Sequence, residues 1–106
     1  MVNRVIARGE VYWANLDPTV GTEIQKTHPA LVVSPGDMNT ALPRVIIAPI
    51  TSAGQPLGCR PEVVIQRKNA RILLDQLRCV DQVRLGKKTG KIDEDVWHAV
   101  LLELLA

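Results

Sequence analysis

The chain has 106 residues, of which 46% are hydrophobic and 23% charged, and these values describe one globular domain with a modest core rather than a disordered chain. No apolar run is long enough to cross a membrane, and the N-terminal residues 1–10 are too short and too interrupted by arginine to form a signal peptide. We therefore expect a single cytoplasmic domain over residues 1–106, with Cys59 and Cys79 as reduced thiols.

The net charge of +2 is unevenly distributed along the chain. Residues 60–91 hold nine basic side chains against three acidic ones, residues 1–59 are balanced, and residues 92–106 are acidic. A basic segment in a chain of low net charge is expected for a protein that binds a polyanion, although solvated strands and turns account for it equally well. A sheet that stacks many nucleic-acid bases does not fit, because the chain has only three aromatic residues, Tyr12, Trp13 and Trp97.

Short strands are predicted along most of the chain, because β-branched and apolar runs alternate with turn signals. The dipeptides Asp17-Pro18 and Pro35-Gly36 mark two of these turns. Residues 85–92 contain two glycines and suggest a short hairpin. The predicted strands cover residues 9–16, 30–34, 44–50, 62–66 and 71–80, the last as one long apolar strand with polar interruptions.

One helix is predicted, at the C-terminal end of the chain. Asp93 is suited to cap this helix, and Glu94 and Asp95 suit the positive end of its dipole. Several short strands followed by one helix in about a hundred residues predict a mainly β fold, a small barrel closed by a C-terminal helix. The apolar residues that recur at helical spacing are Trp97, Val100, Leu101 and Leu104.

Four strings, RGEVYWANLDPTVGTE, HPALVVSP, VIIAPIT and LLDQLRCVDQVRL, follow one another in an order and spacing that closely resembles the MazF/PemK/Kid family of toxins. The resemblance covers about residues 8–105 and implies an SH3-like β-barrel with a C-terminal α-helix. It also implies a homodimeric endoribonuclease, an mRNA interferase that needs no cofactor or metal and cuts single-stranded RNA. In this reaction the 2′-hydroxyl attacks its own phosphate and leaves a 2′,3′-cyclic phosphate and a 5′-hydroxyl. The implied partner is a MazE-like antitoxin, whose extended acidic tail covers the RNA groove.

The resemblance also implies the catalytic residues. Family members carry an arginine before the proline of the RPALVVS motif and a threonine at the end of the PIT motif, and the matching positions here are His28 and Thr51. Transesterification needs a base for the 2′-hydroxyl, an acid for the leaving oxygen and donors for the charge that grows on the phosphate. A guanidinium is charged at any physiological pH, whereas an unperturbed imidazole, with a pKa of about 6.5, carries its charge about a quarter of the time near neutrality.

The histidine at position 28 therefore leaves three interpretations open. In the first, His28 is a variant catalyst, because histidine is the commonest acid–base residue in enzymes. In the second, the chain is a natural toxin of reduced activity. In the third, an arginine was replaced deliberately so that a host survives making the protein.

The RNA-binding residues follow from the same motifs. Thr22, Glu23 and Gln76 match family positions that line the RNA groove, and Arg78 and Arg84 of the basic segment are expected to contact phosphate. Trp13 is expected to pack in the core or in the dimer rather than to stack on a base. Two alternatives remain, a non-catalytic RNA-binding barrel and a CcdB-like gyrase poison acting through the C-terminal helix, and the HPALVVS and PIT strings favour the ribonuclease over gyrase poisoning.

Overall fold

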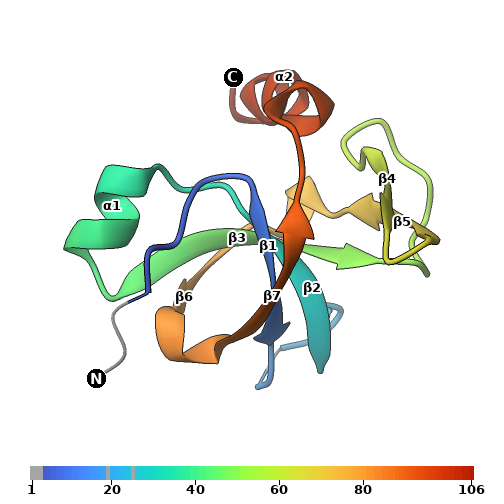
Figure 1. Cartoon of the computed structure of the whole chain (residues 1–106). Helices are drawn as coiled ribbons and strands as arrows, with labels where there is room; N and C mark the ends of the chain where they lie inside the picture. Colours follow the sequence, from blue (N-terminus) through green and yellow to red (C-terminus); the bar gives the residue numbers. More distant parts are fainter. Residues whose placement is uncertain (1–3, 19, 25) are drawn as a thin grey trace.

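The computed structural model describes residues 4–18, 20–24 and 26–106, and within them the chain forms a curled sheet with two α-helices (Figure 1). The helices are α1 (Gly36–Ala41) and α2 (Glu94–Leu105), and two short 3₁₀ turns are η1 (Leu74–Gln76) and η2 (Gln82–Arg84). The strands are β1 (Glu10–Asn15), β2 (Thr27–Val32), β3 (Arg44–Thr51), β4 (Glu62–Ile65), β5 (Lys68–Ile72), β6 (Arg78–Asp81) and β7 (Leu85–Lys91).

The sheet is antiparallel throughout and is organised around β3. The strand order is β4-β5-β3-β2-β1-β7, and β6 pairs with the first half of β3. Because the two ends of β3 pair with different neighbours, the sheet curls into a half-barrel, and β4 and β5 form a separate lobe at its side (Figure 1). The predicted mainly β fold with a C-terminal helix is therefore confirmed.

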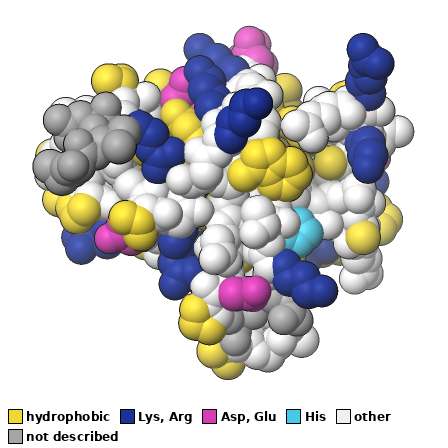
Figure 2. Space-filling view, turned by 60° about the horizontal axis from the view of Figure 1, so that its bottom comes forward, with side chains coloured by type: hydrophobic (Ala, Val, Ile, Leu, Met, Phe, Trp, Pro, Cys, Tyr) yellow, Lys and Arg dark blue, Asp and Glu magenta, His cyan; other side chains and the backbone are white. Residues whose placement is uncertain are grey.

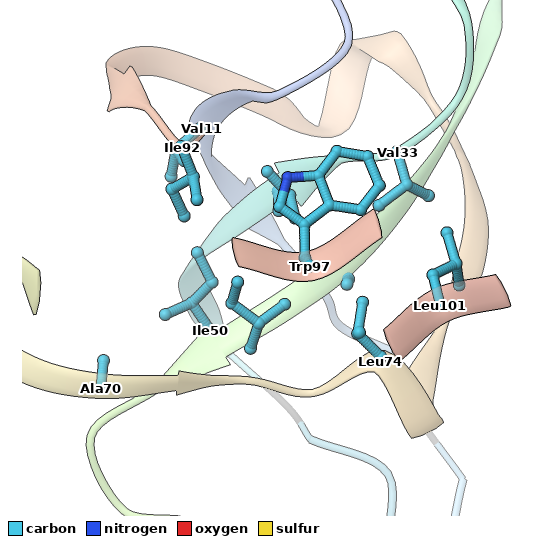
Figure 3. Packing of buried hydrophobic residues seen from close by; sticks show 11 residues of the cluster. Val11, Val33, Ile50, Ala70, Leu74, Ile92, Trp97 and Leu101 are labelled. Atoms are coloured by element: carbon cyan, nitrogen blue, oxygen red, sulfur yellow. The ribbon is translucent and has the colours of Figure 1, made fainter. Parts of the chain in front are cut away.

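The central strands are buried on both faces. Val11 and Leu31 belong to a cluster that lies under α2, whereas their neighbours Tyr12 and Ala30 belong to a second cluster. Successive side chains of a strand point to opposite faces, so one strand contributes to both clusters. Figure 3 shows the first cluster, in which Trp97 of α2 lies among apolar side chains from the sheet and is fully buried.

The predicted helix over the last residues is confirmed, with its cap. The Asp93 carboxylate accepts a hydrogen bond from the Asp95 N–H at 2.9 Å, and this bond satisfies one of the free donors at the helix start. Trp97 and Leu101 are buried against the sheet, whereas Leu104 is 41% exposed. The helical spacing therefore identified the core-facing residues except in the last turn.

Three local predictions were wrong. Residues 71–80 do not form one strand, because the polar Asp75 and Gln76 lie in the turn η1, which separates β5 from β6. The segment 85–92 is not a hairpin, since residues 85–91 form the single strand β7 against β1. A second helix, α1, follows Pro35 and is fixed by the buried Asn39, whose side-chain amide donates to the carbonyls of Ile6 and Ser34.

Candidate active site

The catalytic residues indicated by the motifs lie at neighbouring strand ends. His28 is the second residue of β2 and Thr51 is the last residue of β3. Ala30 lies opposite Pro49 in the antiparallel register of the two strands, and the same register continued by two residues brings His28 opposite Thr51. Residues opposite each other in antiparallel strands lie on the same face of the sheet, so the two residues share a face.

A pocket of about 210 Å³ lies at these strand ends. Figure 2 turns the lower end of Figure 1 toward the viewer and shows a histidine at the surface with hydrophobic and basic side chains around it. The pocket is open to solvent and its lining is contributed by β1, β2, β3, the segment after β3 and the β4–β5 hairpin. The lining includes Trp13, His28, Thr51, Ser52, Gln66 and Lys68.

The two catalytic candidates differ in how they are held. Thr51 is buried, with 9% of its surface exposed, and its Oγ1 accepts a hydrogen bond from the Ala53 N–H at 3.2 Å. The hydroxyl proton of Thr51 is still available, because a hydroxyl accepts and donates at the same time. His28 is half-buried, and among the described residues its imidazole forms no hydrogen bond. The site therefore combines a hydroxyl held by a backbone hydrogen bond with an imidazole that no described residue holds by a hydrogen bond.

A second pocket, of about 180 Å³, brings together three of the five predicted RNA-binding residues, Glu23, Gln76 and Arg78. Gln76 reaches this position from η1, and its Oε1 accepts a hydrogen bond from the Ile24 N–H at 2.9 Å. The side-chain NH₂ group of Gln76 keeps its N–H donors for hydrogen bonds to acceptor atoms of a base or a sugar. Thr22 lies exposed in the neighbouring loop and does not line this pocket.

Arg78 and Arg84 have a structural role that the sequence did not indicate. Arg78 Nη1 donates to the Leu16 carbonyl at 2.9 Å, and Arg84 Nη1 donates to the carbonyls of Asn15 (3.2 Å) and Asp17. These bonds tie β6 and η2 to the end of β1, where the loop toward Glu23 begins. Their contact with phosphate stays a prediction.

Trp13 and Lys68 are two of the pocket residues that the sequence did not indicate. Trp13 is half-buried and lines the pocket of His28 instead of lying in the hydrophobic core. Both residues are far in sequence from the two catalytic motifs. The one local signal was the polar string QRKN between two apolar runs, which is typical of a hairpin tip.

The part of the chain that the structure describes contains neither a metal-binding cluster nor a membrane-spanning helix. Across residues 4–18, 20–24 and 26–106, no three His, Cys, Asp or Glu side chains gather as a metal site would require. In the same residues, no helix is long and apolar enough to span a membrane.

Known proteins are similar to this chain in sequence and in fold. The family model described as PemK-like, MazF-like toxin of type II toxin-antitoxin system matches residues 7–106. The chain belongs to this toxin family. Among members of the MazF/PemK family, it is 33% identical over 102 residues to Endoribonuclease EndoA of Bacillus subtilis, a match that covers 91% of this chain and 88% of EndoA. It is also 32% identical to Endoribonuclease PemK of Escherichia coli, over 89% of this chain and 75% of PemK.

Solved structures of MazF toxins match the fold. The crystal structure of MazF (Form-I) from Deinococcus radiodurans superposes with a TM-score of 0.84 at 25% identity, covering 97% of this chain and 98% of that chain. A MazE-MazF structure (Form-III) from the same organism matches with a TM-score of 0.74 at 26% identity, over 96% of this chain and 97% of that chain. The resemblance indicated by the four sequence strings is therefore confirmed.

Proposed function

We propose that this protein is an endoribonuclease toxin that cleaves single-stranded messenger RNA without a metal ion, and that residues 1–106 form a single MazF/PemK-like domain. The observation that supports this most directly is the meeting of His28 and Thr51 at one pocket, on adjacent strand ends. The similarity to EndoA and PemK, which are named endoribonucleases, supports the same reaction class.

The proposed chemistry uses the two residues in different ways. The neutral imidazole of His28 accepts the proton of the 2′-hydroxyl, whose oxygen then forms a bond to the neighbouring phosphorus. The Thr51 hydroxyl donates to a non-bridging phosphate oxygen, where negative charge accumulates. The bond from phosphorus to the 5′-oxygen breaks, and that oxygen takes a proton from water or from the imidazolium. The products are a 2′,3′-cyclic phosphate and a 5′-hydroxyl.

The second pocket is proposed to hold the nucleotides next to the cleaved bond. Glu23 and Gln76 offer an acceptor and donors for base edges, and Thr22 lies in the loop beside them. Arg78 and Arg84 are proposed to add phosphate contacts through the guanidinium nitrogens that the carbonyls of Asn15, Leu16 and Asp17 do not use.

The proposed partners follow from charge and from the relatives. A MazE-MazF structure of Deinococcus radiodurans is among the matches, and we propose that this chain is likewise neutralised by a MazE-like antitoxin. An acidic antitoxin tail and RNA would both be attracted by the basic residues 60–91. We also propose that the protein acts as a homodimer in the cytoplasm, where messenger RNA is translated.

The test is cleavage of a long RNA in excess chelator, followed by mapping of the ends. We expect cuts at a short sequence motif with 2′,3′-cyclic phosphate and 5′-hydroxyl termini, and no cut where the scissile nucleotide is 2′-deoxy. Activity that requires added magnesium would contradict the metal-free mechanism. An intact RNA with both the chain and His28→Arg, together with RNA binding, would instead establish a non-catalytic RNA-binding barrel.

A further inference from the structure

Lys68 is the permanent cation of the catalytic pocket. It is the first residue of β5 and lines the same pocket as His28 and Thr51. Among the described residues that line this pocket, no other is a lysine or an arginine, and none is acidic. The imidazole at position 28 is charged only while it is protonated, so a phosphate bound here has one group with a lasting positive charge to contact.

The register of the hairpin explains why Lys68 faces the pocket. Lys68 lies opposite Ile65, and two residues further along Ala70 lies opposite Val63. Alternate residues of a strand share a face, so Lys68 lies on the same face of β5 as the buried Ala70 and Ile72. This face is covered by the core at Ile72 and opens into the pocket at Lys68.

The turn before Lys68 is short and geometrically defined. Gln66 and Arg67 form the two-residue connection between β4 and β5, and their φ angles are 50° and 66°. Positive φ at both positions is the geometry of a type I′ turn, which matches the twist of the strands it joins. Neither residue is a glycine, so both adopt a backbone conformation that side chains with a Cβ disfavour. Lys68 is therefore held by a tight hairpin and not by a long loop.

Two arginines near the pocket, Arg60 and Arg71, are already paired. Arg71 lies opposite Thr51, but its Nη2 is 2.6 Å from Glu62 Oε1 and its Nη1 donates to the Arg60 carbonyl. Arg60 in turn binds both carboxylate oxygens of Asp75. Lys68 forms no ion pair and no side-chain hydrogen bond with any residue that the structure describes. Its charge is therefore available to an incoming anion.

We propose that Lys68 binds the phosphate at the cleavage site and supplies there the positive charge that an arginine at position 28 would otherwise provide. This inference rests on the proposed ribonuclease function. The proposal couples Lys68 to residue 28: the contribution of Lys68 to the cleavage rate is largest when residue 28 is not a permanent cation.

A double-mutant cycle tests this coupling. Single-turnover cleavage of one RNA would be compared for the chain, Lys68→Gln, His28→Arg and the double variant. We expect Lys68→Gln to slow cleavage about 10²- to 10³-fold, because it removes one preorganised group from the developing phosphate charge. In the His28→Arg background the same change should cost less than about threefold. Equal losses in both backgrounds would overturn the proposed coupling.

Two control variants separate a phosphate contact from general electrostatics. Arg44→Gln removes an exposed cation at the far end of β3 from Thr51, and we expect cleavage to stay unchanged. Arg67→Gln removes a charge next to Lys68 that does not line the pocket, and we expect a loss below about twofold. An Arg67→Gln loss as large as that of Lys68→Gln would overturn the contact.

Binding of an RNA with a 2′-deoxy scissile nucleotide gives a readout that does not depend on cleavage. Loss of one phosphate contact should lower the slope of log affinity against log salt by about 0.7 in Lys68→Gln. If no variant cleaves and this slope still falls, the ribonuclease proposal fails while the phosphate contact stands. If the chain or His28→Arg cleaves and Lys68→Gln matches Arg44→Gln in both assays, the inference about Lys68 fails alone.

Discussion

His28 lies opposite Thr51 when the register of β2 and β3 is followed to the ends of both strands. The two residues come from separate motifs, and α1 and most of β3 lie between them in the chain. The antiparallel pairing alone brings the motifs together, and it leaves both side chains on one face at the rim of the sheet. Substitutions at these two positions should therefore affect one chemical event.

The first prediction concerns the pH dependence of cleavage. If His28 is the base, the rate should rise with pH, because only the neutral imidazole accepts the proton of the 2′-hydroxyl. His28→Arg should remove this dependence, because arginine keeps its charge at any physiological pH. His28→Ala should lower the rate by about 10²- to 10⁴-fold.

The measurement is a pH–rate profile of the three proteins on one RNA. A chain that is inactive and becomes active as His28→Arg would indicate a lost arginine and not a working histidine catalyst. Identical profiles for all three proteins would show that position 28 takes no part in catalysis.

The second prediction concerns the Thr51 hydroxyl. Thr51→Val keeps the shape of this buried side chain and removes the donor, so cleavage should fall by about 10²- to 10³-fold. The lost bond from Ala53 N–H should also lower the free energy of unfolding by about 1 kcal/mol. Thr51→Ser keeps the hydroxyl and should retain most of the activity. Thr40→Val, on an exposed position of α1, is the matched control and should change neither rate nor stability measurably.

The sequence predicted the elements whose residues carry a local signal. Asp93 and the acidic residues after it marked the start of α2, and the apolar run 44–50 marked β3. The prediction for residues 71–80 was wrong because a run of buried apolar residues shows no alternation of apolar and polar side chains. Only the polar Asp75 and Gln76 mark the turn within this segment.

The candidate site was predictable only in part. His28 and Thr51 were identified through a family resemblance, because neither residue is distinctive on its own. Trp13 and Lys68 reach the pocket through the pairing of distant strands, and no local pattern encodes that pairing. From the sequence, Arg78 and Arg84 were expected to be available for phosphate. In the structure, Arg78 donates to the Leu16 carbonyl, and Arg84 donates to the carbonyls of Asn15 and Asp17.

The third prediction concerns Tyr12, the one tyrosine of the chain. Burial and a hydrogen bond from its hydroxyl to Glu10 Oε1 at 3.0 Å raise the pKa of Tyr12 to about 12. A folded pKa above the unfolded value of about 10 contributes stability that is complete below pH 10 and is lost as the pH rises toward 12. A difference of this size corresponds to about 3 kcal/mol.

Absorbance at 295 nm reports this ionisation without interference from another tyrosine. We expect a midpoint near pH 12 in the folded protein, with circular dichroism recorded in parallel to detect unfolding. Glu10→Gln should move the midpoint down toward 10 but not to it, because the burial of Tyr12 remains. A midpoint at pH 10 while the protein is folded would contradict the buried hydrogen bond.

The last prediction concerns the contact that closes the segment between β3 and β4. Arg60 Nε and Nη2 donate to the two carboxylate oxygens of Asp75 at 2.9 and 2.8 Å, and Arg60 Nη1 donates to the Gln55 carbonyl at 3.2 Å. The hydrogen bonds from Arg60 hold the pKa of the Asp75 carboxyl below its ordinary value. A lowered carboxyl pKa contributes stability that is present above about pH 4 and is lost as the pH falls through the folded pKa.

Asp75→Asn should therefore destabilise the protein at pH 7 by about 1–2 kcal/mol, a value reduced from that of a buried pair because the Asp75 side chain is 29% exposed. The difference should shrink as the pH falls below about 4, where the parent carboxyl also becomes neutral. Urea unfolding at several pH values measures both effects. Glu62→Gln is the matched control. Glu62 forms an ion pair with Arg71 between β4 and β5, but its side chain is 75% exposed, so we expect a change below about 0.5 kcal/mol. Equal destabilisation by Asp75→Asn and Glu62→Gln at pH 7 would show that the bidentate contact of Arg60 does not hold the segment between β3 and β4.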